Sequence, residues 1–324
     1  MRASTRQLSA LVAGTAMAAT LAACSSSSAS PTPGKSASGG AANAQAGFPV
    51  TVTTAAGTTH LTSRPETIVS LSPTATEMLY AIGAGSQVKA VDDESDYPKQ
   101  APMTKLSGFT PNAEAIAAYK PDLVIISNNI DGISAKLKAL SIPVLDLPAA
   151  ANVSGVYAEF TELGAATGHV AQAQATDSTL KADIKQIVAA EPTHSKPLTY
   201  YYEISTNPYY SVTSSTFIGS LLSLLGMKSI ADAASGAAAA GGYPTLSAEY
   251  ILKANPDYII LADTGSAGGG QDAAKVGARP GWSVLTAVKD KHIILLNTDI
   301  ASRWGPRIID LLRDVATGIK SGSQ

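Results

Sequence analysis

Two stretches of the chain repeat each other: residues 113–126 read AEAIAAYKPDLVII and residues 248–261 read AEYILKANPDYIIL. They align without a gap at an offset of 248 − 113 = 135 residues and share six identities: Ala113/Ala248, Glu114/Glu249, Ile116/Ile251, Pro121/Pro256, Asp122/Asp257 and Ile125/Ile260. Each copy combines a helical pattern, a Pro that ends the helix and an apolar run typical of a buried strand. A repeat that is too long for a solenoid and occurs twice predicts two similar lobes.

Strand and helix patterns alternate on both sides of the two copies. Short apolar runs predict buried strands at 68–71, 88–91, 123–126, 144–147, 200–204, 258–261 and 293–296. Helical patterns are expected between them, at 113–119, 132–140, 217–225 and 306–319, and Thr74-Ala75-Thr76-Glu77 has the spacing of a capping box that opens another helix. This alternation predicts an α/β fold of two Rossmann-like lobes, each with a mostly parallel sheet between two layers of helices.

A long helical pattern separates the two halves. Residues 170–191 contain no Gly or Pro, an apolar face includes Leu180 and Ile184, and Pro192 ends the pattern. About 22 residues form a helix of roughly 33 Å, long enough to act as a rigid spine between the lobes. The expected division is a signal peptide (1–23), a linker (24–47), an N-terminal lobe (48–150), a helical segment (151–192) and a C-terminal lobe (193–324). Small ligands bind in clefts between such lobes.

The first residues have the pattern of a secretory signal. Arg2 and Arg6 precede an uncharged apolar stretch, residues 8–21, and Leu-Ala-Ala-Cys ends at Cys24, the one cysteine of the chain. This ending resembles the bacterial lipobox, which implies lipidation of Cys24 and an extracytoplasmic protein attached to the cell membrane by its lipid anchor. An ordinary signal peptide with a chance cysteine is the alternative. The Ser, Ala, Gly and Pro residues that follow predict a disordered tether.

Composition excludes several classes of protein. The 324 residues include 23 Lys and Arg against 25 Asp and Glu, a net charge of −2, whereas nucleic-acid-binding proteins carry a basic excess. With 45% hydrophobic and 15% charged residues, the chain can build a core. No nucleophile elbow or zinc-protease motif is present, and the four histidines, His60, His169, His194 and His292, lack metal-ligand spacing. We therefore expect a protein that is not an enzyme and has no resident metal or cofactor.

Two clusters of side chains are candidates for ligand contact. Five of the twelve tyrosines lie between Tyr200 and Tyr210, and Tyr209 and Tyr210 follow the predicted strand at 200–204, where rings can point into a ligand crevice. The alternative is that the rings at 200–202 pack in the core. Asp and Glu gather at 92–96, and there they would repel an anionic ligand if that loop faces the cleft, or else form a solvated surface loop.

Several motifs resemble one family. IVSLSPTATE at 68–77, Asp-Tyr-Pro at 96–98, Lys-Pro-Asp at 120–122 and Trp-Gly-Pro-Arg at 304–307 resemble the substrate-binding lipoproteins of cobalamin and ferric-siderophore importers. The resemblance runs from about Thr67 to Ile319 and implies a protein that delivers a small-molecule ligand to the permease and ATPase of an ABC transporter.

The subgroup that the motifs resemble most is that of the cobalamin-binding proteins. By that resemblance, Asp299 and Arg303 would hydrogen-bond the peripheral amides of a corrinoid, cobalamin or cobinamide, and Phe109 and Tyr243 replace tryptophans of the cleft. The full set of predicted ligand contacts is Tyr97, Phe109, Tyr209, Tyr210, Tyr243, Asp299 and Arg303. Two positions, Glu94 and Ser127, depart from the pattern because aromatic rings are expected there.

Two alternatives stay open for the ligand and for the function. A ferric siderophore or haem is the alternative ligand, with Tyr243 as a haem ligand, although such anions usually need several arginines. A lipid-anchored enzyme or adhesin is the alternative of a different class.

The repeat also predicts a pair of docking residues. Glu114 and Glu249 occupy matching positions after the expected N-caps Asn112 and Ser247. By resemblance, the family uses such a pair to dock on arginines of the permease. Stabilisation of the helix macrodipole is the alternative role for both carboxylates.

Overall fold

The computed structural model describes residues 47–266 and 269–322. The predicted signal peptide, the lipidation site Cys24 and nearly all of the predicted linker lie outside these residues. The first described element is an antiparallel hairpin that the sequence patterns did not predict, formed by β1 (Val50–Thr54) and β2 (Gly57–Leu61).

The N-terminal lobe is built on a five-stranded parallel sheet in the order β5-β4-β3-β6-β7. Its strands are β3 (Ile68–Leu71), β4 (Val88–Asp92), β5 (Met103–Leu106), β6 (Leu123–Ile126) and β7 (Val144–Asp146). The chain enters at the central β3, adds β4 and β5 on one side and then β6 and β7 on the other. This order is that of a Rossmann-like, doubly wound sheet.

The C-terminal lobe has a four-stranded parallel sheet in the order β11-β8-β13-β14. Its strands are β8 (Leu198–Glu203), β11 (Met227–Ser229), β13 (Tyr258–Leu261) and β14 (Ile293–Leu295). A small antiparallel sheet of β9 (Ser205–Thr206), β10 (Tyr209–Tyr210) and β12 (Thr245–Leu246) follows the end of β8. Here too the order reverses, because β11 lies on one side of β8 and β13 on the other.

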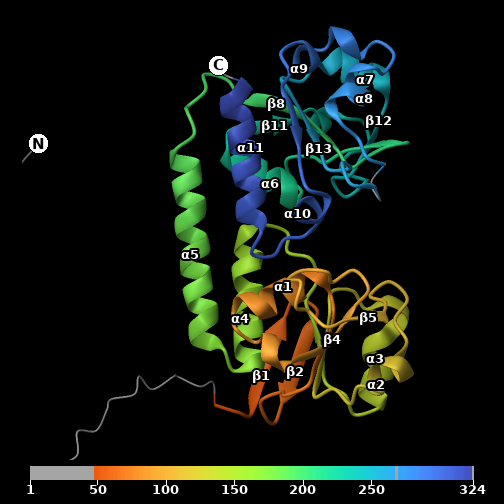
Figure 1. The fold of residues 1–324 in the computed structure, drawn as a ribbon, viewed down its shortest axis with the longest axis vertical. Helices are drawn as coiled ribbons and strands as arrows, with labels where there is room; N and C mark the ends of the chain where they lie inside the picture. Colours follow the sequence, from red (N-terminus) through yellow and green to blue (C-terminus); the bar gives the residue numbers. More distant parts are fainter. Residues whose placement is uncertain (1–46, 267–268, 323–324) are drawn as a thin grey trace, which may run out of the picture. The chain divides into compact units, whose positions relative to one another are not determined.

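Helices cover both faces of each sheet (Figure 1). Successive side chains of a strand point to opposite faces of its sheet. On β6, Leu123 and Ile125 face one core cluster while Val124 and Ile126 face another. The helices are α1 (Pro73–Ala81), α2 (Ala113–Ala117), α3 (Ile133–Ala139), α4 (Val153–Thr167), α5 (Val170–Ala189), α6 (Phe217–Leu224), α7 (Ala248–Ala254), α8 (Ala273–Gly277), α9 (Thr286–Lys289), α10 (Thr298–Ser302) and α11 (Ile308–Gly322). The predicted α/β fold with two three-layer lobes is confirmed.

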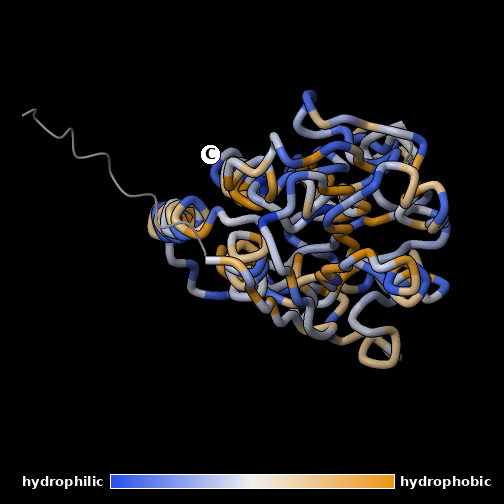
Figure 2. The backbone as a smooth tube through the Cα atoms, turned by 90° about the horizontal axis from the view of Figure 1, so that it is seen from below, coloured by the Kyte–Doolittle hydropathy of each residue, from blue (hydrophilic) through white to orange (hydrophobic). Residues whose placement is uncertain are grey.

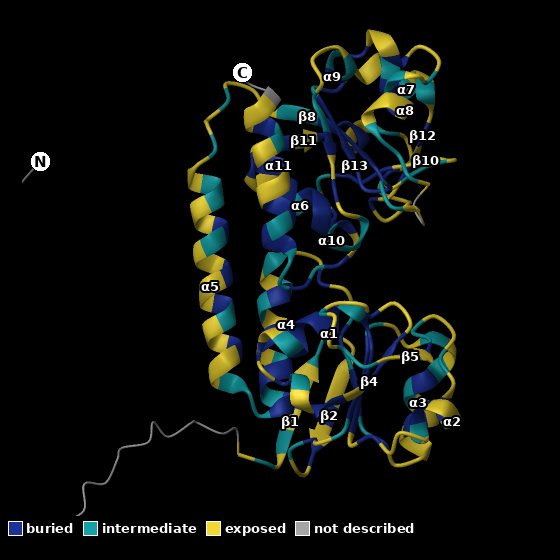
Figure 3. Ribbon diagram, in the orientation of Figure 1, coloured by how far each residue is buried: buried dark blue, intermediate teal, exposed yellow. Residues whose placement is uncertain are grey.

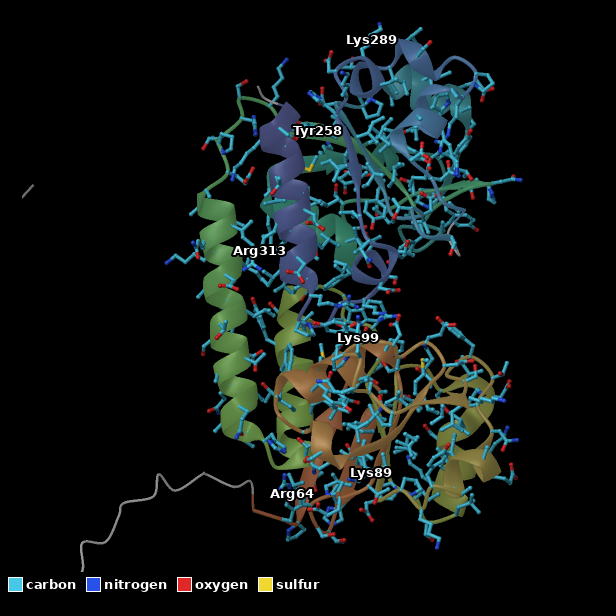
Figure 4. All side chains as sticks on the ribbon, in the orientation of Figure 1. Arg64, Lys89, Lys99, Tyr258, Lys289 and Arg313 are labelled. Carbon is cyan, nitrogen blue, oxygen red and sulfur yellow. The ribbon has the colours of Figure 1, made fainter. Side chains whose placement is uncertain are left out.

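The expected spine helix is α5, which packs against α4 and α11 and has a long exposed face (Figure 3). Arg313 of α11 reaches Asp183 of α5 at 3.2 Å, and Figure 4 shows Arg313 beside α5. Helix α4, which the patterns did not resolve, packs against both β1 and α6. One hydrophobic cluster therefore runs through both lobes, from Val52 to Ile319, and the hydrophobic segments lie mainly inside in Figure 2.

The repeat is confirmed, and one helix start is corrected. Asn112 and Ser247 cap α2 and α7 by accepting hydrogen bonds from the backbone N–H groups of Ala115 and Tyr250. The capping box at Thr74 was wrong: Ser72 is the N-cap of α1, and Pro73 takes the first helical position. Glu77 does not cap the helix: it is buried and pairs with Arg303 and Arg307.

Candidate functional site

A cavity of about 300 Å³ opens at the carboxyl ends of the C-terminal sheet. Ligands of doubly wound sheets bind at the point where the strand order reverses, and this cavity lies beside the ends of β8 and β13, where that occurs. Ala149 and Ala150 reach it from the end of the N-terminal lobe. Its wall is mainly aromatic and aliphatic and includes Tyr202, Val212, Phe217, Ile218, Tyr243 and Trp304.

The aromatic part of this wall is preorganised. The rings of Phe217 and Trp304 meet edge to face with centroids 6.2 Å apart. Tyr202 points to the cavity side because side chains alternate along β8, which places Tyr200 and Tyr202 in one core cluster and Tyr201 in another. Rings held in this way offer a rigid apolar surface to a flat ligand.

One acidic side chain lines the cavity. Asp263 follows β13 and is 1% exposed, and neither of its carboxyl oxygens has a hydrogen-bond partner among the described residues. Burial, with the negative charge of Glu203 as the next cause, raises the pKa of Asp263 to about 7, although Arg279 opposes this shift. Glu203 itself is fully buried and binds Arg279 through two hydrogen bonds of 2.6 Å.

A cluster of ion pairs lies close to the cavity. Arg303, which is 8% exposed, donates to Asp96 at 2.9 Å, to the Glu94 carbonyl at 2.9 Å, to Glu77 at 3.3 Å and to Asp299 at 3.3 Å. The cluster joins α10 of the C-terminal half to α1 and the acidic loop of the N-terminal lobe. That loop therefore contacts the other lobe, and Asp92, the last residue of β4 before it, is buried.

The predicted amide-binding pair is placed in this cluster. Asp299 and Arg303 are hydrogen-bonded to each other, and the Arg303 guanidinium already has four partners. A ligand amide would have to compete with these partners for Arg303, whereas the Asp299 side chain is 41% exposed and more accessible. Their role as ligand contacts stays a prediction.

The predicted aromatic contacts do not gather at one place. Tyr243 lines the cavity and is 42% exposed. Tyr209 packs against Trp282, with ring centroids 5.5 Å apart, and Tyr210 is exposed on β10. In the N-terminal lobe, the Tyr97 ring lies under the Arg307 guanidinium at 4.2 Å.

Phe109, at 70% exposure, follows the end of β5. Glu94 and Ser127 do not line the cavity, so their departure from the aromatic pattern leaves its wall unchanged.

Sequence reasoning missed Asp263 and Glu77 as site residues. Asp263 had a signal, because it stands two positions past a predicted buried strand, where side chains reach the ligand crevice of a parallel sheet. Glu77 had none, since its partner arginines lie more than 220 positions away.

The two docking candidates are exposed in matching first turns. Glu114 follows Asn112 on α2, and Glu249 follows Ser247 on α7. Hydrogen bonds from its own backbone N–H and from the Ser247 hydroxyl lower the pKa of Glu249, which stays ionised and available to a cation.

Within residues 47–266 and 269–322, no three His, Cys, Asp or Glu side chains are placed to hold a metal ion. Across the same ranges, no helix is both long and apolar enough to cross a bilayer.

A family model described as periplasmic binding protein matches residues 68–300, which include both parallel sheets and most of the residues that line the cavity. The chain belongs to this family. A periplasmic binding protein carries a solute outside the cytoplasm to an ABC importer, so this chain is a substrate-binding protein of that kind, and the family resemblance of the sequence is confirmed. Members of the family are solute-binding proteins rather than enzymes.

Individual relatives match this chain over most of their own length. An uncharacterised ABC transporter substrate-binding lipoprotein of Bacillus subtilis is 32% identical over 84% of this chain and 86% of its own. A cobalamin-binding protein of Halobacterium salinarum is 29% identical over 83% of this chain and 73% of its own. The crystal structure of a possible iron-binding, periplasmic solute-binding protein of Staphylococcus epidermidis is 28% identical, covers 79% of this chain and 99% of its own, and superposes with a TM-score of 0.68.

Proposed function

We propose that this protein captures a corrinoid, cobalamin or cobinamide, at the cavity beside β8 and β13 and delivers it to an ABC importer. The observation that carries the proposal is the chemistry of the cavity: rigid aromatic and aliphatic walls with a few polar groups. A corrinoid presents a wide ring edged with neutral amides, which such walls and groups suit. The similarity to the cobalamin-binding protein of Halobacterium salinarum supports this ligand.

The size of the cavity limits how the ligand is held. Ligand pockets usually span about 300 to 1,000 Å³, and this cavity of about 300 Å³ is at the lower end. It therefore takes one edge of a corrinoid, and the rest of the ring lies outside it. The exposed rings of Tyr97 and Phe109 are the candidates to contact that outer part.

The charges near the cavity favour a neutral ligand over an anionic one. Arg303 and Arg307 are paired with Glu77, and Arg279 is paired with Glu203. Ferric siderophores and haem carry negative groups that need unpaired cations. Similarity to the Staphylococcus epidermidis protein keeps an iron-containing ligand as the second candidate, with the exposed Tyr243 as its contact.

Calorimetric titration tests the ligand. Purified protein is titrated with cyanocobalamin, dicyanocobinamide, haemin and ferric enterobactin, a trianionic siderophore complex, under the same conditions. We expect the two corrinoids to bind with micromolar or lower dissociation constants and the two iron compounds to bind at least tenfold more weakly. Tighter binding of haemin or ferric enterobactin would favour the second candidate. Turnover of a supplied substrate without any such binding would favour an enzyme.

We further propose that Glu114 and Glu249 dock the protein on basic residues of the permease. Their exposure at matching positions of the repeat supports this role. The Glu114→Arg, Glu249→Arg double variant should bind ligand normally but fail to support uptake, because it presents cations to cations. A matched Glu66→Arg variant changes another exposed carboxylate and should transport normally. Unimpaired uptake by the double variant would refute docking through this pair.

We also propose that Cys24 carries the lipid anchor. The position of the cysteine after Leu-Ala-Ala and the similarity to a Bacillus subtilis lipoprotein support this assignment. Cells that express the protein are labelled with an alkyne fatty acid, and the label should be lost in Cys24→Ser. Retention of the label by Cys24→Ser would contradict the assignment of the lipid anchor to Cys24.

A further inference from the structure

Asp263 is the most unusual polar group of the cavity. Its side chain is 1% exposed, it lines the cavity, and neither carboxyl oxygen has a hydrogen-bond partner within 3.5 Å among the described residues, although the Glu203 carboxyl is near enough to help raise its pKa. Buried polar groups almost always have a hydrogen-bond partner, because an unsatisfied one loses the bonds that water would give it. A buried carboxyl in the wall of a ligand pocket therefore points to a partner that the ligand supplies.

The surroundings of Asp263 decide which groups it can take. Both oxygens of Glu203, on the neighbouring β8, are held by Arg279, and Arg279 also donates to Gln271 at 2.9 Å. The guanidinium charge is thus balanced by Glu203, and a second negative charge at Asp263 has no cation of its own. An uncharged Asp263 is favoured, and a neutral carboxyl has one O–H donor together with carbonyl acceptor capacity.

Resting on the proposed function, we propose that Asp263 is a ligand-contacting residue and that it binds a terminal amide of the corrinoid, an uncharged group that both donates and accepts a hydrogen bond. The Asp263 O–H donates to the amide oxygen, and the Asp263 carbonyl oxygen accepts from the amide N–H. A carboxylate in place of that amide offers no N–H and adds a charge beside Glu203.

A second polar group stands in the same wall. The hydroxyl of Tyr202 is buried and also has no partner among the described residues. Burial, with charges on nearby Tyr200, Tyr243 and Asp263 as further causes, raises the pKa of Tyr202, so its phenol stays protonated and can donate. Asp263 and Tyr202 together form the polar end of an otherwise apolar cavity.

The proposal predicts that corrinoid binding weakens as the pH rises. The pKa of Asp263 is raised to about 7, so the donor form is lost above neutral pH. The charged and titratable groups that act on Asp263 and its neighbours are Glu203, Tyr201 and Tyr202 of β8, Arg279 after α8, and Tyr243. Arg279 and the phenols keep their protons between pH 6 and 8, so Asp263 dominates the change there.

Two substitutions separate a ligand contact from a structural role. Asp263→Asn replaces the neutral carboxyl by an amide that also donates and accepts hydrogen bonds. Its affinity for cyanocobalamin at pH 6 should therefore stay within about threefold of that of the unsubstituted protein. The decline of affinity between pH 6 and 8 should disappear in this variant. Asp263→Ala removes both hydrogen bonds and should weaken binding on the order of tenfold or more. Asp290→Ala, at an exposed aspartate, is the matched control and should bind as the unsubstituted protein does. Circular dichroism checks that each variant is folded.

The experiment is calorimetric titration of these proteins with cyanocobalamin and with its amide-hydrolysed monocarboxylic acids at pH 6, 7 and 8. Weaker binding of at least one monocarboxylic acid, no pH dependence in Asp263→Asn and a tenfold loss in Asp263→Ala would support the assignment. Equal affinity of Asp263→Ala and the unsubstituted protein would overturn the assignment and leave the proposed function intact. Failure of the unsubstituted protein to bind any corrinoid would overturn both.

Discussion

Glu77 and Arg307 are 230 positions apart in the sequence, yet two hydrogen bonds of 2.6 and 2.9 Å join their side chains. Glu77 is buried on α1 of the N-terminal lobe, and Arg307 immediately precedes α11 of the C-terminal half. The same carboxylate contacts Arg303 at 3.3 Å. A single buried acid therefore holds two arginines of the other half of the chain.

Removing this charge should destabilise the protein. In Glu77→Gln, two largely buried guanidinium groups lose their common anion, and breaking a buried ion pair costs about 3 to 5 kcal/mol. Urea unfolding of Glu77→Gln should show this loss in the free energy of unfolding. The exposed Glu66→Gln, in the same lobe, should change it by less than about 0.5 kcal/mol. Equal stability of the two variants would contradict the role of Glu77.

Local sequence patterns were sufficient to predict most strands of the two parallel sheets. The strands at 68–71, 123–126 and 258–261 match to the residue, because each is a fully buried apolar run that ends at polar or turn residues. The hairpin β1–β2 was missed because only three of its ten residues are buried, so its apolar alternation is weak. Helix α4 lies within the predicted helical segment 151–192, but its bounds were not predicted because Gly155 and Gly164 interrupt its helical pattern; its buried face packs against both lobes.

Gly108 should not tolerate a side chain. A Cβ there would lie 2.7 Å from the Leu71 carbonyl oxygen and 2.9 Å from an Asp92 carboxyl oxygen, closer than real Cβ atoms come. Gly108→Ala should therefore shift the loop that carries Phe109 and lower the free energy of unfolding by about 1 to 3 kcal/mol.

Thermal unfolding measures the effect at Gly108, with Gly47→Ala as the control because its Cβ would meet no atom within 4 Å. Equal melting temperatures for the two variants would contradict the close contact.

Glu159 should make stability depend on pH. Burial first, and the charge of Glu162 second, raise its pKa from 4.5 to about 8. Between these values the folded state holds a proton that the unfolded state has lost, so stability falls as the pH rises, by at most about 1.4 kcal/mol per pH unit, and levels off above pH 8.

Glu159→Gln has no such proton to lose. The free energy of unfolding of Glu159→Gln minus that of the unsubstituted protein should be larger at pH 9 than at pH 5. Urea unfolding of both proteins at the two pH values measures this difference. A constant difference between the two proteins would show that Glu159 does not titrate as described.

The site was less predictable than the fold. Arg303 was assigned to the ligand from a motif, but its buried position among four acceptors depends on α1 and on the loop after β4, which are distant in sequence. Tyr209 was expected to face the ligand crevice, but Trp282, 73 positions later, provides an aromatic partner on another face. Such contacts follow from tertiary packing and have no local signal.

The central claim is that a corrinoid binds at the cavity lined by Trp304. The chain has two tryptophans: Trp304 lines the cavity, and Trp282 is fully buried in the outer core cluster of the C-terminal lobe. The most direct measurement is fluorine NMR of protein labelled with 5-fluorotryptophan, with the two signals assigned from Trp282→Phe and Trp304→Phe. Saturating cyanocobalamin should shift the Trp304 signal and leave the Trp282 signal nearly unchanged. An unshifted Trp304 signal at saturation would contradict the account.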